Sequence, residues 1–140
     1  MQIALQTALF VLLAPSTAVA ACFDEDHSVP TEYRASAAVL SGVVVSAQML
    51  PSTDDDAPGA FDGIYYKIQV IHSYRGPFRS TVTIYSENSS GRFPMDVGSN
   101  YIVFLDKRGN HLAADNCGNS GLLEENQKVV TVVERLQRSK

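Results

Sequence analysis

The strongest constraint on the fold is a stretch of regular alternation between residues 64 and 74. Apolar or aromatic side chains occupy most of its even positions, and polar side chains occupy most of its odd positions. A period of two residues is the side-chain repeat of a β-strand with one buried face. The pattern therefore predicts a long strand from Ile64 to Tyr74 that has His72 on its inward face.

Four other segments have the length and composition of strands, and turn sequences rich in Gly, Pro or Asn separate them. They cover residues 37–49, 81–85, 101–105 and 111–114. In the first segment, one face is predicted to carry these apolar side chains: Val39, Val43, Val45, Ala47 and Met49. Gly42 interrupts the same segment and predicts a sharp bend or a bulge. In the segment 81–85, Val82 and Ile84 are expected to point inward.

The C-terminal segment has a different period. Its apolar residues recur at spacings of three and four, which is the repeat of an amphipathic helix: Val129, Val132, Val133 and Leu136. Acids stand near the expected start and bases near the expected end, as the helix dipole favours. The pattern predicts a helix from about Glu124 to Gln137. The β-branched run at residues 129–133 leaves a sixth strand as the alternative.

These elements together indicate the fold class. Residues 23–35 are polar and mixed, contain Pro30, and predict an extended lead-in to the first strand. Five strands must then hide their sheet edges, and a small barrel with a closing helix does so in about this length. We expect a mainly β protein, a five-stranded OB-like Greek-key barrel with a C-terminal helix. A β-sandwich is the alternative, but it normally needs seven or more strands.

The N-terminal segment is typical of export. No charged side chain occurs between Met1 and Phe23, and residues 8–14 form an apolar run that Pro15 ends. The run is far shorter than the roughly 20 residues that span a bilayer. Small residues suit cleavage after either Ala20 or Ala21. Residues 1–21 are therefore predicted to be a signal peptide and residues 22–140 one domain, which is secreted or located in the periplasm or cell envelope.

The chain contains two cysteines, Cys22 and Cys117. In an exported protein, two cysteines most simply form one disulfide, since an unpaired thiol is a liability in an oxidising compartment. The alternative is lipidation, because residues 19–22 read Val-Ala-Ala-Cys and resemble a lipobox. Acylation of Cys22 would make the chain a structural module tethered to the membrane. Without lipidation, no membrane contact is expected.

Charge and motifs argue against several function classes. With 15 acidic and 11 basic residues, the net charge is −4, whereas nucleic-acid binding needs a clustered basic surface. The three histidines, His27, His72 and His111, lack metal-site spacing. No nucleophile motif of a known hydrolase type is present. We expect no catalytic residues, no metal and no cofactor, and therefore a binding domain with a protein or peptide partner outside the cytoplasm.

Several segments together resemble the netrin-like domains, which include the N-terminal domains of the tissue inhibitors of metalloproteinases and their bacterial relatives. The segments are an N-terminal cysteine and residues 37–44, 66–70, 74–76 and 97–104, followed by the late Cys117. The resemblance covers about 100 of the roughly 120 residues of the expected domain and implies an OB-like barrel. It also implies a disulfide between the first cysteine and one that follows the strand at 101–105, which matches Cys22 with Cys117.

The resemblance further implies a mode of action. In the metalloproteinase inhibitors, the N-terminal cysteine binds the protease zinc through its α-amino nitrogen and carbonyl oxygen, and the next side chain enters the specificity pocket. Cys22 would be the chelator here, Phe23 the pocket residue, and a zinc metalloprotease the partner. The chain departs from the family at Asp24, which replaces the second cysteine of a Cys-x-Cys start. It also lacks the family's other bridges, and cleavage after Ala20 would leave Ala21 in front of Cys22.

Overall fold

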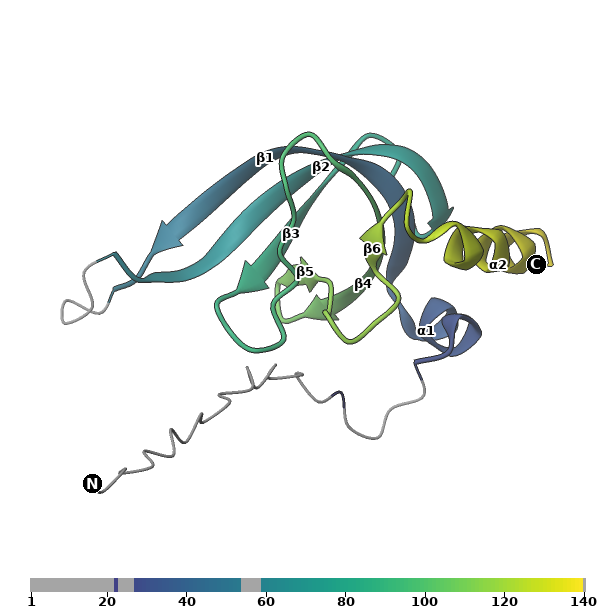
Figure 1. Ribbon diagram of the computed structural model, residues 1–140, viewed down its shortest axis with the longest axis horizontal. Coiled ribbons are helices and arrows are strands. Elements are labelled where there is room, and N and C mark those ends of the chain that lie inside the picture. Colours follow the sequence, from purple (N-terminus) through teal and green to yellow (C-terminus); the bar gives the residue numbers. More distant parts are fainter. Residues whose placement is uncertain (1–21, 23–26, 54–58, 140) are drawn as a thin grey trace, which may run out of the picture.

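The computed structural model describes residue 22, residues 27–53 and residues 59–139 (Figure 1). Two helices and six strands occur in this part of the chain, as follows: α1 (Val29–Ala35), β1 (Ala38–Pro51), β2 (Phe61–Arg75), β3 (Thr81–Glu87), β4 (Asn100–Arg108), β5 (His111–Ala113), β6 (Gly121–Leu122) and α2 (Gln127–Arg138). The predicted signal peptide at residues 1–21 lies outside the described residues, and so does Phe23.

The strands form a nearly closed antiparallel barrel. Their order is β3-β2-β1-β4-β5, and the short β6 pairs with β4. Because β4 lies beside β1 rather than beside β3, the connection from β3 to β4 crosses the barrel in Greek-key fashion. β3 and β5 then face each other and complete the wall. The predicted fold class is confirmed: the protein is mainly β, with a five-stranded OB-like barrel and a C-terminal helix.

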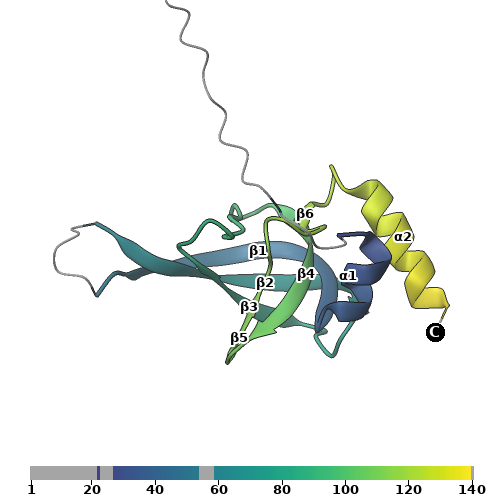
Figure 2. The ribbon, with the colours of Figure 1, turned by 90° about the horizontal axis from the view of Figure 1, so that it is seen from below.

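The two helices lie side by side at one end of the barrel (Figures 1 and 2). They cover the outer face of the central strands, so β4 is buried on both of its faces. One core fills the barrel interior and includes Leu40, Ile68 and Val103. A second core lies between the sheet and the helices and includes Phe104 and Val133. Burial on both faces explains why residues 101–105 read as a continuous apolar run.

Helix α2 confirms the C-terminal prediction and excludes the sixth strand at residues 129–133. It begins at Gln127, three residues later than predicted, after the N-cap residue Asn126. Glu124 and Glu125 lie in the turn before the helix, and its first turn contains no acid. The apolar face of α2 holds the helix in place, because it packs into the second core, where Val133 is fully buried.

Helix α1 corrects the expectation of an extended lead-in. Pro30 is in the first turn, where its fixed φ suits a helix and its missing N–H removes no hydrogen bond. Tyr33 is 2% exposed and donates a hydrogen bond from its hydroxyl to the carbonyl of Tyr74 at 3.0 Å. Only one turn of this short helix faces the core, which is too little for a periodic signal in the sequence.

The predicted inward position of His72 is wrong, because a bulge in β2 reverses the alternation. Ser41 pairs with His72, but Gly42 pairs with Val70, so Ile71 has no partner across the ladder. An extra residue moves every following side chain to the opposite face. His72 is therefore exposed, and its Nε2 lies 3.2 Å from Oε1 of Gln137 in α2. The irregularity predicted at Gly42 is confirmed by this register shift.

The predicted shared face of the first strand is also wrong. Val44 pairs with Ile68 and Ser46 pairs with Lys67, so Val45 forms a second bulge. Because the bulge reverses the alternation, Val39 and Ala47 lie on opposite faces of β1. β1 pairs with β4 only as far as Val43. Beyond that point β1 has no strand on its β4 side, whereas β2 stays paired with β3 as far as Gly63. In this part of β1, Val45 is 46% exposed and Met49 is 57% exposed. The inward positions predicted for Val82 and Ile84 are confirmed.

Candidate functional site

A disulfide joins Cys22 to Cys117, with 5.6 Å between their Cα atoms. It links the start of the described chain to the segment that follows β5, across a sequence separation of 95 residues. Cys22 is exposed and Cys117 is half-buried. The predicted pairing is therefore confirmed, and the bridge presents Cys22 at the surface next to the end of the barrel wall.

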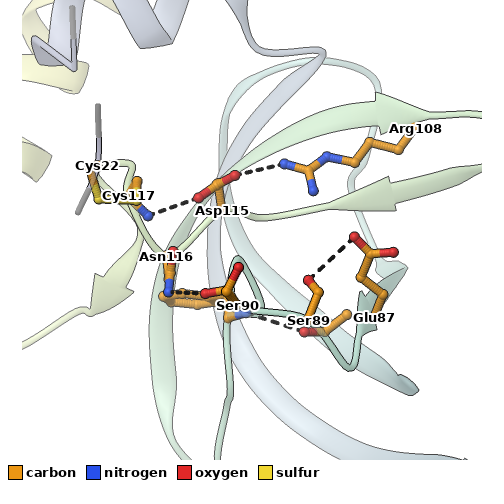
Figure 3. Close-up of polar contacts among 10 residues, drawn as sticks. Cys22, Glu87, Ser89, Ser90, Arg108, Asp115, Asn116 and Cys117 are labelled. Atoms are coloured by element: carbon orange, nitrogen blue, oxygen red, sulfur yellow. Dashed lines mark hydrogen bonds and ion pairs between the residues drawn. A yellow bond between two sulfur atoms is a disulfide. The ribbon is translucent and has the colours of Figure 1, made fainter. Parts of the chain in front are cut away.

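Asp115 holds Cys117 in place from two residues away. Its Oδ1 accepts a hydrogen bond of 2.9 Å from the backbone N–H of Cys117, and its Oδ2 lies 2.9 Å from Nη2 of Arg108 (Figure 3). Arg108 is the last residue of β4. Burial pushes the pKa of Asp115 upward, but the Cys117 amide and the Arg108 guanidinium outweigh it and lower the pKa of this carboxyl below its ordinary value. The disulfide is thus connected to the barrel through a charged carboxylate.

A second attachment lies two residues after Cys117. The side-chain amide of Asn119 donates to the carbonyl oxygen of His27 at 2.7 Å. The same amide and the backbone N–H of Asn119 both donate to Oε2 of Glu32 in α1, at 2.5 Å and 2.7 Å. Cys22 and His27 are therefore both held against one short segment, residues 117–119. We call the set Cys22, His27, Glu32, Asp115, Cys117 and Asn119 the N-terminal anchor.

The loop after β3 packs against this anchor. The side-chain amide of Asn116 donates to the carbonyl of Ser90 at 3.0 Å, next to the bridge (Figure 3). Within the loop, the Ser89 hydroxyl donates to Oε1 of Glu87 at 3.4 Å. Asn116, Ser89 and Ser90 are exposed. Three segments that are distant in sequence, at residues 22, 87–92 and 115–119, thus form one continuous part of the surface.

A small cleft borders this surface on the outside of the barrel. It measures about 200 Å³ and is lined by residues from β3, from the 88–92 loop and from the region of β5. Its lining residues include Tyr85, Glu87, Arg92, Arg108, His111 and Ala114. Tyr85, Tyr65 and His111 form an aromatic cluster beside it, with ring centroids 5.0 to 5.6 Å apart.

The structure brings together only some of the residues considered in the sequence. Cys22 and Cys117 meet, whereas Phe23 lies outside the described residues. The histidines remain apart, since His27 contacts Asn119, His72 contacts Gln137, and His111 contacts the aromatic cluster. Within residues 22, 27–53 and 59–139, no three His, Cys, Asp or Glu side chains gather in a way that could hold a metal ion.

No sequence pattern indicated that the polar residues of the anchor would meet, or that the rings of the aromatic cluster would pack together. Glu32 and Asn119 are 87 positions apart, and neither belongs to a recognised motif. Asp115 offered a weak signal, because an Asp two residues before a backbone amide commonly accepts its hydrogen bond in a turn. Tyr65 and Tyr85 face each other across the β2–β3 ladder, so only the register of the two strands identifies them as neighbours.

Comparisons with known proteins identify no relative. No protein-family model matches the chain, and no curated protein is significantly similar to it. Among the helices that the structure describes, none has the length and apolar character needed to cross a membrane.

Proposed function

We propose that this chain is an exported, non-enzymatic binding domain of netrin-like type that presents its N-terminus to a protein or peptide partner outside the cytoplasm. The observation that carries the proposal is the two-point attachment of the N-terminal segment. Cys22 is held by the disulfide to Cys117, and His27 is held by Asn119. Both attachments act on a segment whose first described residue, Cys22, is exposed.

Rigid attachment favours binding for a thermodynamic reason. A flexible terminus loses conformational freedom when it docks, and this loss lowers its affinity for the partner. A terminus already fixed to the barrel through Asp115 and Arg108 loses less. The exposed 88–90 loop lies beside it and adds contact area for the same partner. The anchor therefore has the properties of a preorganised recognition surface.

The netrin-like resemblance suggests the class of partner. If the signal peptide is removed after Ala21, the α-amine and carbonyl oxygen of Cys22 become a bidentate pair on a rigid base. A catalytic zinc site keeps one coordination position open for water or substrate, and such a pair can occupy it. Phe23 would then enter an adjacent apolar pocket of the enzyme. The proposed partner is therefore a zinc metalloprotease, and the proposed action is its inhibition.

The test compares two forms of the mature protein that differ by one residue. One form begins at Cys22, and the other carries Ala21 in front of it. The extra residue converts the α-amine into an amide, which has no lone pair available for zinc. We expect the form that begins at Cys22 to inhibit members of a panel of zinc metalloproteases and the extended form to be inactive. Equal potency would exclude amine chelation, and no inhibition by either form would exclude the inhibitor function.

The lipid-tether hypothesis needs the same sulfur atom as the disulfide. A Cys22 sulfur that is acylated cannot pair with Cys117, so the observed bridge favours the untethered form. The bridge is also compatible with a location outside the cytoplasm, where disulfides persist. Mass spectrometry of the protein isolated from its own cells distinguishes the lipid-tethered form from the untethered form. A chain that starts at an unlipidated Cys22 supports the proposal. A chain that starts at Ala21 supports the untethered domain but excludes zinc chelation by Cys22 in the natural protein. A diacylglyceryl mass at Cys22 would replace the proposal with the tether.

A further inference from the structure

The cleft beside the N-terminal anchor lies at the seam of the barrel. β3 and β5 face each other there, yet within the described residues no backbone hydrogen bond joins them. Side chains close the wall instead, and the gap between the strands leaves the space of about 200 Å³. Its lining includes three small residues, Gly91, Ala113 and Ala114. Because their side chains are short or absent, they leave a ligand room to reach the larger lining side chains.

The wall of the cleft is a fixed aromatic ring, that of Tyr85. One side of this ring covers Gly63, where a Cβ atom would lie only 2.5 to 2.6 Å from three of its atoms. The hydroxyl donates to the carbonyl of Asp62 at 3.2 Å. Tyr65 and His111 each pack with their centroids 5.0 Å from that of Tyr85. The ring is held on several sides and contributes a rigid apolar surface to the cleft.

The charged residues that line the cleft, which we call its rim, include both an acid and bases. Glu87 offers a carboxylate, and Arg92 and Arg108 offer guanidinium groups. Each is oriented by a neighbour: Glu87 by Ser89, Arg92 by the side-chain oxygen of Asn88 at 3.3 Å, and Arg108 by Asp115. Each also keeps capacity for a ligand, because a guanidinium has five donors and a carboxylate about four acceptor positions.

We propose that this cleft binds a single neutral sugar ring, with one C–H face of the ring against Tyr85 and its hydroxyl groups on Glu87 and Arg92. A sugar ring has an apolar face and a margin of hydroxyls that both donate and accept, which matches an aromatic wall under a rim of mixed charge. The cleft is smaller than the roughly 300 Å³ at which pockets for drug-sized ligands begin, so one ring is the appropriate size.

Other ligand classes fit less well. A nucleic acid needs clustered positive charge, whereas Arg108 is paired with Asp115 and the lining also contains the carboxylate of Glu87. An apolar side chain of a protein partner would leave the charges of Glu87 and Arg92 without new hydrogen bonds while removing them from water. The site does not depend on the proposed protease inhibition, because neither the α-amine of Cys22 nor Phe23 takes part in it.

The experiment is a titration followed by amide chemical shifts of the ¹⁵N-labelled mature protein. The probes are methyl glycosides of neutral hexoses and of N-acetylhexosamines, with N-acetyl-phenylalaninamide and inorganic phosphate as comparison ligands. We expect saturable shifts at Gly91, Ala113 and Ala114 with at least one methyl glycoside and a Kd of about 1 mM, a value typical of a ligand of about a dozen heavy atoms.

Three variants and a control test the geometry. Tyr85→Ala should weaken binding about tenfold, because the stacking surface is lost. Tyr85→Phe should change it less than about twofold, because the hydroxyl donates to Asp62 rather than into the cleft. Arg92→Ala, at an exposed position, should weaken it about fivefold without affecting folding. Arg79→Ala is the matched control, because Arg79 is exposed, does not line the cleft, and donates to the Gly76 and Phe78 carbonyls.

Several outcomes would overturn the proposal. Absence of saturable shifts with every glycoside up to about 100 mM would exclude a sugar site of useful affinity. Saturation by the phenylalanine amide alone would reassign the cleft to a protein side chain, and saturation by phosphate alone would reassign it to anions. Unchanged binding in both Arg92→Ala and Tyr85→Ala would place the sugar elsewhere. If Tyr85→Ala does not fold, the proposal is tested by the other two variants, and unchanged sugar binding by Arg92→Ala would then contradict it.

Discussion

The carboxylate of Glu32 accepts two hydrogen bonds from Asn119, one from its backbone N–H at 2.7 Å and one from its side-chain amide at 2.5 Å. This contact ties α1 to the segment that carries Cys117, and the same Asn119 amide reaches His27. Hydrogen bonds that a carboxylate accepts are stronger than hydrogen bonds between two neutral groups. Within the N-terminal anchor, α1 is therefore held to a segment that lies 87 positions later in the sequence.

The first prediction concerns this contact. Glu32→Ala removes the acceptor of the Asn119 backbone N–H and one of the two acceptors of its side-chain amide, in a half-buried position, and should lower the free energy of unfolding by about 1–3 kcal/mol. Glu32→Gln keeps an acceptor oxygen and should cost less. Urea titration measures both, with Glu134→Ala on the exposed side of α2 as control. A Glu32→Ala protein as stable as the control would show that the contact adds nothing to stability.

The second prediction concerns the disulfide. The loop it closes spans a sequence separation of 95 residues. Removing such a link by the double change Cys22→Ser and Cys117→Ser should lower the free energy of unfolding by about 2–4 kcal/mol, because the unfolded chain regains conformational freedom. A reductant should produce a similar loss in the wild type and none in the double variant. Equal urea midpoints for oxidised and reduced wild type would contradict the prediction.

The third prediction concerns Gly42, which pairs with Val70 of β2 next to the bulge at Ile71. A Cβ atom at this position would overlap the carbonyl oxygen of Gln69 and lie 2.6 Å from Cγ2 of Ile68. The backbone of a central strand cannot move aside freely, so Gly42→Ala should cost about 1–3 kcal/mol. Gly91→Ala is the control, because the nearest atom to its new Cβ would be 3.9 Å away. Thermal unfolding of the two variants provides the comparison, and similar melting temperatures would refute the argument.

The fourth prediction concerns pH. The pKa of Asp115 is lowered in the folded protein: burial raises it, but the Cys117 amide and Arg108 outweigh that effect. A carboxyl with a depressed folded pKa contributes stability above its unfolded pKa of about 3.9, and this contribution is lost as pH falls through the folded value.

Accordingly, Asp115→Asn should be less stable than the wild type at pH 7, and the difference should shrink as the pH falls from about 5 to below 3. Urea titrations of both proteins at several pH values measure the difference directly. Asp115 and Arg108 are 38% and 45% exposed in their side chains, so added salt should also reduce the difference at pH 7. A constant difference across the pH range would exclude the ionised form of Asp115 as its cause.

Part of the candidate site could be predicted from the sequence. Two cysteines in a chain with an export-type N-terminus imply a bridge, and the structure contains it. Glu32 and Asn119 could not be predicted, because their contact depends on how α1 docks beside the barrel. Tyr85 and His111 belong to strands that meet only when the barrel closes, so no local pattern identifies the cleft.

The sequence by itself determined the five strands β1 to β5 and the C-terminal helix, but it did not indicate the short β6. Side-chain periodicity is a local property, so residues 64–74 and 127–138 carry their structure in their own composition. Tertiary structure decided which face of each strand is buried. The bulges at Ile71 and Val45 arise from pairing between β1 and β2, and each one moves the following side chains to the other face. His72 consequently lies exposed beside Gln137 of α2, although the alternation around it predicts the barrel interior.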